Sequence, residues 1–308
     1  MEEQAYHIPA LLPQTIEALD IKPTGIYVDV TLGGGGHSRA IASHLGPEGH
    51  LYSLDRDSEA IARAQATPNF TPVHGDFRYL ANYMRYYGVP GRVDGILADL
   101  GVSFHHFDDA SRGFSFRADA PLDMRMNRDG GITAAELLAT ASEERLAEIF
   151  RLYGELRQAR RLAAAIAASR RQGKVIGTTQ ELADLATPLL NRADYKKELA
   201  QLFQALRIEV NGEMEALESF LQSTLSVLAP GGRLAIITYH SLEDRMVKNF
   251  MRSGRCDGEI RKDLFGRAEV PFKVLTPKPV VPDAEEITRN PRSRSAKLRV
   301  AQRLLSND

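Results

Sequence analysis

The chain has a single cysteine, Cys256, among its 308 residues. One thiol excludes a disulfide framework and a thiolate-rich metal site within one chain. Long hydrophobic runs are also missing, since no apolar stretch approaches the ~20 residues that a membrane-spanning helix needs. The first residues, Met1-Glu2-Glu3, are acidic and lack the basic and then apolar pattern of a signal peptide. These absences predict a cytoplasmic protein without a membrane span.

An excess of charge of one sign is missing as well. The formal net charge of -1 gives no overall indication of a nucleic-acid partner. Locally the charge is clustered, because residues 151–174 hold seven basic side chains against one acid, and residues 289–303 hold no acid. Such clusters suit contacts to phosphates. A solvated surface covered by long basic side chains gives the same pattern, so the clusters alone leave both interpretations open.

The first hundred residues alternate strand and helix patterns. Short apolar or β-branched runs predict strands at 26–31, 50–54, 70–74 and 92–100, with helices near 38–45 and 58–65. This order implies a parallel sheet with right-handed crossovers, as in doubly wound α/β proteins. Two last strands, at 272–276 and 296–301, predict an antiparallel C-terminal hairpin. A mostly parallel sheet that ends in such a hairpin is typical of class I methyltransferases.

The alternation breaks after Gly101, because the next clear buried strand is 233–238. The residues between them have helical patterns, and Thr133-x-x-Glu136 and Thr178-x-x-Glu181 are capping-box signatures. A chain of this length also exceeds the usual size of one domain. We therefore expect a helical insertion at 105–208 within a sheet domain formed by 1–104 and 209–308. The stretch 209–228 would be the crossover helix that returns to the sheet.

The strongest local signal is the glycine-rich segment from Asp29 to His37, which follows the first strand and opens a helix. Glycines let the backbone approach a ligand closely, and a helix N-terminus supplies oriented N–H groups. The segment is no P-loop, because no Gly-Lys-Ser/Thr follows. It also departs from the dinucleotide motif, since His37 replaces the last glycine. A turn without a ligand remains the simpler alternative.

The ends of the second and third strands carry further candidates. Asp55 ends the second strand, where an acid can accept both ribose hydroxyls of a nucleoside cofactor. Because NAD and S-adenosylmethionine share this requirement, Asp55 does not separate them, and a surface aspartate is the alternative. Phe77 follows the third strand, where adenine usually lies. Its ring would pack against the base or belong to the core.

Asp99 ends the fourth strand, where the switch-point crevice of a doubly wound sheet opens. We expect it to face the position of methyl transfer. An exocyclic cytosine amine is a poor nucleophile, so it needs an acceptor for its N–H and close alignment with the sulfonium methyl. A carboxylate suits that role. Attack through ring carbon C5 would need a cysteine nucleophile, and Cys256 lies in a polar segment far from any predicted strand end.

Two clusters contain residue types that bind metals, but we predict no bound metal. They are His105-His106-x-Asp108-Asp109 after the fourth strand and His240–Arg245 after the fifth. Neither has the His-x-x-x-His spacing that places two ligands on one helix face. Ser241-x-x-Asp244 is interpreted as a capping box instead. His240, at a strand end beside the crevice, is expected to contact the substrate and serve catalysis.

Long motifs in the right order resemble the bacterial 16S ribosomal RNA cytosine-N4 methyltransferases (RsmH, formerly MraW) nearly from end to end. The matching strings are His7–Leu12, Gly33–Ser38, Asp55–Asp57, Asp94–Ser103, Gly113–Phe116, Pro121–Met126, Phe203–Ile208, His240–Arg245 and Asn290–Arg299. The resemblance implies N4 methylation of a cytidine in the decoding centre of the small ribosomal subunit. It also implies S-adenosylmethionine as donor, 16S rRNA as partner, and a homodimer as one form of the protein.

The resemblance further implies which residues contact the cofactor: Gly34, Gly35, Gly36, His37, Asp55, Phe77, Asp99 and His106. At the last of these the chain departs from the family, which usually has Ser-Ser-Pro-Gln-Leu-Asp where this chain has Ser103-Phe-His-His-Phe-Asp108. A histidine cannot present the paired donor and acceptor of an amide, which puts that contact in doubt.

The helical insertion is the part of the chain from which we expect RNA recognition. The basic residues predicted to bind RNA are Arg157, Arg160, Arg161, Arg292 and Arg294. The first three have the i, i+3, i+4 spacing that places side chains on one helix face. Two rival functions remain from the residues alone: a nicotinamide oxidoreductase, and an RNA-binding assembly factor with a vestigial cofactor fold. Intact Asp55 and Asp99 weigh against the second.

Overall fold

The computed structural model describes residues 9–101, 110–128, 130–262, 266 and 268–305. The chain divides into two compact units, which we call the sheet unit and the helical unit. The sheet unit comprises 1–101 and 215–308, and the helical unit comprises 102–214. The boundaries expected from the sequence are 104/105 and 208/209, and the two compact units divide at 101/102 and 214/215.

The sheet unit is built on seven strands in the order β3-β2-β1-β4-β5-β7-β6. The strands are β1 (Ile26–Asp29), β2 (His50–Asp55), β3 (Phe70–His74), β4 (Val93–Asp99), β5 (Leu228–Thr238), β6 (Phe272–Val274) and β7 (Lys297–Arg303). The first five are parallel, while β7 runs antiparallel to both β5 and β6. The predicted fold class is confirmed: a mostly parallel α/β sheet that ends in an antiparallel pair.

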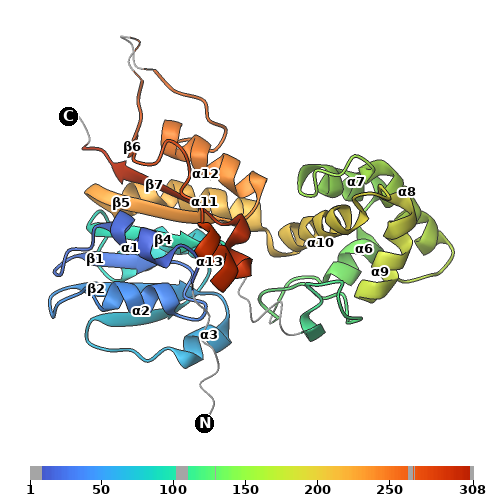
Figure 1. The fold of residues 1–308 in the computed structure, drawn as a ribbon, viewed down its shortest axis with the longest axis horizontal. Helices are drawn as coiled ribbons and strands as arrows, with labels where there is room; N and C mark the ends of the chain where they lie inside the picture. The colour runs from blue at the N-terminus through green and yellow to red at the C-terminus, as the bar shows by residue number, and fades with distance from the viewer. Residues whose placement is uncertain (1–8, 102–109, 129, 263–265, 267, 306–308) are drawn as a thin grey trace. The chain divides into compact units, whose positions relative to one another are not determined.

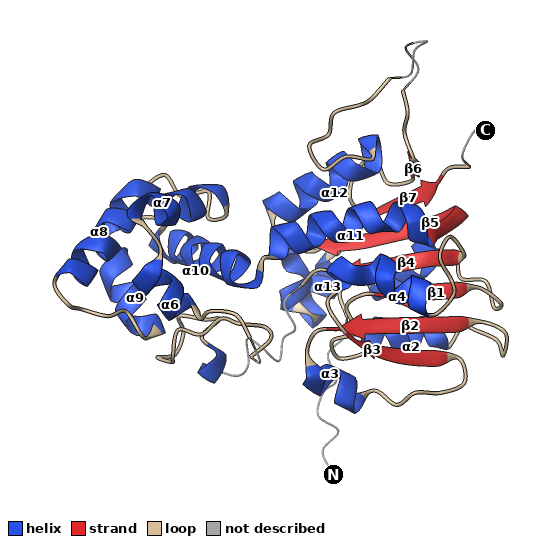
Figure 2. Ribbon diagram, turned by 180° about the vertical axis from the view of Figure 1, so that it is seen from behind, coloured by secondary structure: helices blue, strands red, loops and turns tan. Residues whose placement is uncertain are grey.

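Helices cover both faces of this sheet. On the face toward the viewer in Figure 1 lie α1 (Leu12–Leu19) and α2 (Gly36–Ala42). The opposite face, turned forward in Figure 2, carries α4 (Leu80–Tyr86), α11 (Glu213–Val227) and α12 (Ser241–Ser253). The sheet is therefore buried on both sides, which explains the nearly continuous apolar pattern of β4 and β5.

Short helices were missed from the sequence. They are α1, α4 and α13 (Ala284–Arg289). The sequence predicted α3 (Ser58–Arg63). The link between β6 and β7 contains α13 and the 3-10 turn η4 (Pro291–Ser295), so these two strands are not joined by a simple hairpin turn. α13 is only six residues long, too short for a helical period to show in the sequence.

The helical unit has its own apolar core. Its helices are α6 (Ala134–Thr140), α7 (Glu143–Leu152), α8 (Ala159–Arg171), α9 (Thr179–Ala186) and α10 (Tyr195–Asn211), with 3-10 turns η2 (Ala110–Arg112) and η3 (Thr187–Leu189). Fully buried Phe150, Leu162 and Leu202 belong to one core cluster. Both predicted capping boxes are present, at the starts of α6 and α9. No helix in the described part of the chain combines the length and apolar composition of a membrane span.

The crossover helix begins later than expected. α10 continues to Asn211 and buries Leu206 and Ile208 in the helical unit. Gly212 then takes the left-handed conformation, with φ of 56°, and α11 starts at Glu213. A left-handed glycine ends a helix at little steric cost. The position of Gly212 therefore explains why the crossover helix covers 213–227 and not 209–228.

Candidate active site

The candidate site lies at the carboxyl edge of the sheet, where β1, β2, β4 and β5 end. β1 lies between β2 and β4, and β5 is the next strand after β4. Parallel strands end at the same edge, so the residues that follow them are brought together. Asp29, Asp55 and Asp99 are the last residues of β1, β2 and β4. Three carboxylates therefore share this edge.

Asp29 anchors the glycine-rich loop from inside. Its side chain is fully buried. Its Oδ2 accepts a hydrogen bond of 2.6 Å from Ser38 Oγ, and its Oδ1 accepts from the Thr31 backbone N–H at 3.1 Å. Burial raises the pKa of Asp29, and the hydrogen bond from Ser38 opposes that rise. We had not proposed Asp29, Thr31 or Ser38 as site residues, although their place beside the glycines was a usable signal.

Asp55 holds the same loop from the neighbouring strand. Its Oδ2 accepts from the Gly33 backbone N–H at 2.7 Å, and its Oδ1 accepts from the Asp57 N–H at 2.8 Å. Burial raises the pKa of Asp55, while these two hydrogen bonds lower it. Each carboxylate oxygen has a second lone pair. The residue can therefore fix the loop and still accept a ligand hydroxyl.

Different structural constraints act on the glycines of the loop. Gly33 and Gly35 take positive φ angles of 50° and 73°. An added Cβ at Gly36 would lie only 2.3 Å from Pro9 Cγ, whereas one at Gly34 would meet no atom within 4 Å. Gly36 is thus required by an N-terminal segment that crosses the loop, and the backbone at Gly34 is open to a ligand.

Phe77 begins the 3-10 turn η1 (Phe77–Tyr79), directly after the end of β3. Its half-buried ring meets the fully buried ring of Phe220 edge-on, with 5.5 Å between the centroids. The sheet-unit core therefore uses one side of this ring. This contact fits the alternative in which Phe77 belongs to the core. The exposed part of its ring remains available to a base.

Asp99 is held by its backbone and approached by one histidine. Its N–H donates to Thr31 Oγ1 at 2.7 Å, and its Oδ2 lies 3.6 Å from His37 Nδ1. Its Oδ1 is buried and has no hydrogen-bond partner among the described residues. Burial raises the pKa of Asp99, and His37 and the neighbouring Tyr239 hydroxyl oppose the rise. An orphaned buried oxygen is costly and calls for a ligand group that can donate to it.

His240 has a structural task that the sequence analysis did not assign. It is the N-cap of α12, and its Nδ1 accepts from the Glu243 N–H at 3.5 Å. Its Nε2 lies 3.1 Å from Glu243 Oε1, and Glu243 Oε2 accepts from the Tyr239 N–H at 2.9 Å. The capping pair is therefore His240 with Glu243, and the prediction of Ser241 with Asp244 is wrong by one residue. The extended backbone of His240 (φ -136°) is what makes it the cap.

Cys256 lies beyond the end of α12, away from the carboxyl edge of the strands. Burial, together with the negative charges of Glu218 and Asp257, raises the pKa of its thiol to about 12. A thiol with this pKa stays protonated near neutral pH and is a weak nucleophile. This supports chemistry that does not pass through a cysteine adduct.

The surface arginines are arranged differently from the predicted helix face. α8 begins at Ala159 with Gln158 as its N-cap, so Arg157 precedes the helix. The expectation that it shares a helix face with Arg160 and Arg161 is therefore wrong. All three side chains are exposed, and none forms an ion pair or hydrogen bond with another described residue. They remain candidates for phosphate contacts.

The C-terminal basic cluster is partly used within the sheet unit. Arg299 donates to both oxygens of Asp244, at 2.7 and 3.1 Å, and Lys297 Nζ lies 3.8 Å from the same carboxylate. The predicted RNA contacts Arg292 and Arg294 lie in η4 and are exposed. The absence of acids from this segment was thus misleading, because Asp244 comes from α12. His106, the last predicted cofactor contact, lies outside the described residues.

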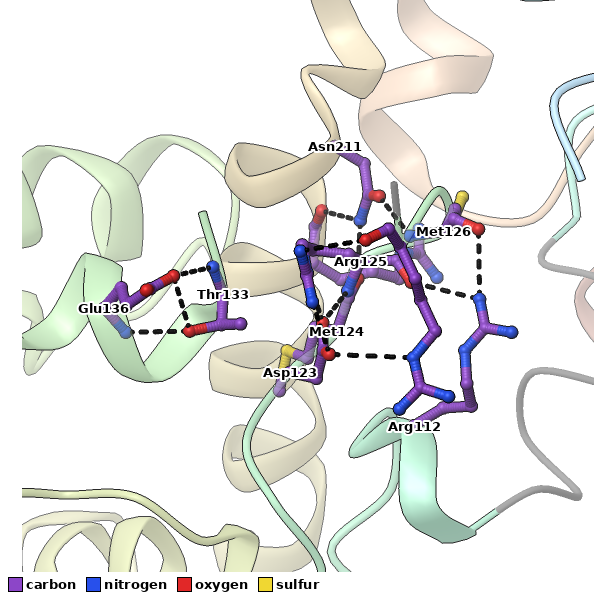
Figure 3. Close-up of polar contacts among 10 residues, drawn as sticks. Arg112, Asp123, Met124, Arg125, Met126, Thr133, Glu136 and Asn211 are labelled. Atoms are coloured by element: carbon purple, nitrogen blue, oxygen red, sulfur yellow. Dashed lines mark hydrogen bonds and ion pairs between the residues drawn. The ribbon is translucent and has the colours of Figure 1, made fainter. Parts of the chain in front are cut away.

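Hydrogen bonds from Arg112 and Asn211 hold the backbone of the Pro121–Met126 motif within the helical unit (Figure 3). We call this network the polar knot. Asn211 donates to Met124 O at 2.8 Å and accepts from the Met126 N–H at 2.7 Å. Buried Arg112 donates to the backbone oxygens of Arg125 and Met126. These bonds hold Met124 at a positive φ of 62°, a strained conformation for a residue with a long side chain.

The family model that matches this chain is that of the MraW methylases, over residues 4–304. The chain belongs to the MraW methylase family. The methylases of this family use S-adenosylmethionine, so the chain is an S-adenosylmethionine-dependent methyltransferase. This confirms the family inferred from the motifs, and the carboxyl edge described above is where we look for its methyltransferase chemistry.

Close relatives bear the name ribosomal RNA small subunit methyltransferase H. That of Bacteroides fragilis is 56% identical over 302 residues, which cover 98% of this chain and 99% of its own. That of Parabacteroides distasonis is 55% identical and covers 99% of this chain and 100% of its own. Among solved structures, TrmN from Thermus thermophilus aligns over 96% of this chain and 48% of its own, with a TM-score of 0.43 and 14% identity, a similarity too weak to carry a conclusion.

Proposed function

We propose that this methyltransferase transfers the methyl group of S-adenosylmethionine to the N4 amine of a decoding-centre cytidine in 16S rRNA of the small ribosomal subunit. The observation that carries the proposal is Asp99 Oδ1, a buried acceptor at the end of β4 with no partner among the described residues. An amine that attacks a methyl group needs such an acceptor for its N–H. The names of the relatives support small-subunit rRNA as the substrate.

The residues at the edge fit a bound nucleoside sulfonium cofactor. The backbone at Gly34 is open, Asp55 keeps unused lone pairs at the end of β2, and Phe77 offers part of its ring beyond β3. When bound, S-adenosylmethionine supplies an electrophilic methyl group. In the proposal Gly34–His37 and Asp55 bind the cofactor, Phe77 packs beside its base, and Asp99 orients the amine and accepts its proton. His240 borders the substrate side.

The helical unit is proposed to bind the RNA. Its exposed Arg157, Arg160 and Arg161 have no acidic partner among the described residues, so their charge is available to phosphates. Arg292 and Arg294 of the sheet unit are proposed as further contacts. In this proposal the phosphate contacts hold the RNA. The residues at the strand ends select one amine and take part in its reaction.

The decisive experiment is transfer of a labelled methyl group to unmodified small ribosomal subunits, followed by mapping of the modified nucleotide. We expect one labelled cytidine, methylated at N4. Label at C5, at a ribose hydroxyl or at another base would overturn the proposed chemistry, and transfer only to other RNA would overturn the substrate.

A thermal-shift series with different cofactors separates the proposed methyltransferase from the nicotinamide oxidoreductase considered from the sequence. The proposal requires stabilisation by S-adenosylmethionine and by its demethylated product, which at a hundredfold excess over Kd amounts to about 2.7 kcal/mol. Stabilisation by NADH in their place would favour the oxidoreductase. Binding of RNA without any methyl transfer would favour the assembly factor.

A further inference from the structure

His37 is held so that the position of one of its protons is determined. The side chain is 6% exposed, at the start of α2. Its Nε2 lies 3.2 Å from the Ala10 carbonyl oxygen. A carbonyl oxygen only accepts hydrogen bonds, so the hydrogen must be on Nε2. In a neutral imidazole this leaves Nδ1 without a proton.

That bare nitrogen would face a carboxylate. Nδ1 of His37 lies 3.6 Å from Asp99 Oδ2. Two lone pairs directed at each other are unfavourable, and burial removes the water that would screen them. A proton on either group makes the contact favourable, through charge or dipole attraction at 3.6 Å and not through a close hydrogen bond. The pair then consists either of an imidazolium and a carboxylate or of an imidazole and a carboxylic acid.

The groups around the pair favour the imidazolium. Asp29 on β1, Glu243 on α12 and the Tyr239 hydroxyl after β5 all face Asp99 or its neighbours. Burial raises the pKa of both Asp29 and Asp99, and His37 is the basic group that opposes the rise at each. A positive charge on His37 therefore interacts favourably with two acids at once, the buried Asp29 and the partly buried Asp99, which a neutral ring cannot do.

We propose that His37 is a positioning residue that carries a proton on both ring nitrogens and thereby keeps Asp99 ionised, with Oδ1 free to accept the proton of the attacking amine. The inference rests on the proposed function, because it assigns the amine's proton to Asp99. It adds an electrostatic role for His37 to the cofactor contact that the family resemblance implies.

The N-terminal segment supplies the geometry. Pro9 packs against Gly36, where an added Cβ would come within 2.3 Å of its ring. The Leu11 N–H donates to Glu286 Oε1 of α13 at 2.7 Å, and Leu11 takes a positive φ of 52°. Ala10, between these two anchors, therefore presents its carbonyl to His37 in a fixed direction. This gives the Pro9–Leu11 part of the N-terminal motif and α13 a shared role at the site.

The amine nitrogen forms a bond to the methyl carbon, and the carbon–sulfur bond breaks with its electron pair moving to sulfur. The proton of the amine passes to Asp99 Oδ1, while His37 keeps both of its protons. Asp99 returns this proton to solvent after the methylated base leaves. The net products are N4-methylcytidine, the neutral thioether and one proton.

The test compares His37→Gln with His44→Gln, a matched change of an exposed histidine near the end of the same helix. Glutamine can still donate to the Ala10 carbonyl but carries no charge. We expect the acidic limb of the kcat–pH profile to move up by at least about one pH unit, so that kcat falls at least about tenfold at pH values below the limb and higher pH restores it. His44→Gln should match the wild type. A loss that is equal at every pH, or a change confined to KM for S-adenosylmethionine, would overturn the inference.

A measurement on the wild-type protein keeps the test decisive if His37→Gln does not fold. In the complex with the demethylated cofactor, 15N NMR of labelled histidines should show both nitrogens of His37 protonated at pH 7. A neutral ring with hydrogen on Nε2 alone would refute the inference, whatever the variants do. Failure of the proposed function is separate, since it would appear as absent methyl transfer by the wild type.

Discussion

The two units stabilise buried and partly buried carboxylates in opposite ways. In the sheet unit, Asp29, Asp55 and Asp99 are held by hydroxyls, backbone N–H groups and one histidine, and burial raises the pKa of each. In the helical unit, burial also acts on Asp123, but the hydrogen bonds and charge of Arg125 outweigh it and lower its pKa. Acids whose nearest cation is at most a histidine retain more affinity for protons and ligands than an acid paired with arginine, which is committed to structure.

The largest expected effect comes from removing the acid at the methyl-transfer position. We expect Asp99→Asn to lower kcat by roughly 10²–10⁴, the usual contribution of a positioned proton acceptor. The pKa of Asp99 is raised in the folded protein, so its ionisation costs stability once the pH rises above about 4. The sheet unit of the variant should therefore unfold at a higher temperature at pH 7 while RNA binding is retained.

Glu48→Gln, a change of an exposed acid in the same unit, is the control and should leave rate and stability unchanged. Single-turnover methyl transfer measures the rate, and hydrogen exchange in β4 measures the local stability. Wild-type turnover by Asp99→Asn would remove Asp99 from the mechanism. A destabilised sheet unit would show that its ionised form is favourable where it lies, and the contrast between the units would then fail.

The next effect concerns the surface of the helical unit. Replacing Arg157, Arg160 and Arg161 with alanine should weaken RNA binding by roughly ten- to a hundredfold and flatten the plot of log affinity against log salt by about two. Binding of the demethylated cofactor should not change, which is the reverse of the Asp99→Asn pattern. Replacing Arg85 and Arg92, exposed arginines of the sheet unit, is the matched control. An unchanged salt slope would mean that the three arginines form only a solvated surface.

A smaller effect is expected within the knot of Figure 3. Asn211→Ala removes the donor to Met124 O and the acceptor of the Met126 N–H, and so leaves buried backbone groups without partners. We expect a loss of about 1–3 kcal/mol in the stability of the helical unit. Hydrogen exchange across 121–128 is the measurement, and Gln172→Ala at the exposed end of α8 is the control. Equal protection in both variants would show that the knot does not hold Met124.

Much of the sheet unit could be predicted from the sequence because its signals are local. Buried strands alternate with helices, and Asp55 and Asp99 were placed correctly at their strand ends. Asp29 was harder to recognise, because nothing in a strand-end aspartate says that it bonds inward to Ser38 and not to a ligand.

Contacts between distant parts of the chain could not be predicted. Asp244 neutralises Arg299 from 55 residues away, and Glu286 caps the Leu11 N–H from 275 residues away. Neither pair leaves a periodic pattern. The cap of α12 was missed for another reason: histidine is an unusual N-cap, so Ser241 was preferred over His240 on propensity. The arrangement of the site thus depends on partners that only the fold brings together.

The last prediction compares how the stability contributions of Asp123 and Asp99 depend on pH, because the two dependences should have opposite signs. Because the pKa of Asp123 is lowered in the folded protein, the carboxylate contributes stability that is present above about pH 4 and is lost as the pH falls through the lowered value. Its Oδ1 accepts from Arg125 Nε at 2.8 Å, and both side chains are partly buried. Asp123→Asn should therefore cost the helical unit about 1 kcal/mol at pH 7, and this cost should shrink as the pH falls from about 4 through the lowered pKa.

Asp99→Asn should behave in the opposite way, with its gain in stability growing from pH 4 upward. Urea unfolding of both variants at several pH values, together with hydrogen exchange in each unit, measures the slope of each variant's change in stability against pH. Slopes of the same sign would mean that both carboxylates are held as structural ion pairs. Opposite slopes would mean that the sheet unit tolerates a destabilising acid at the end of β4, which is reasonable only if that acid is used in the reaction.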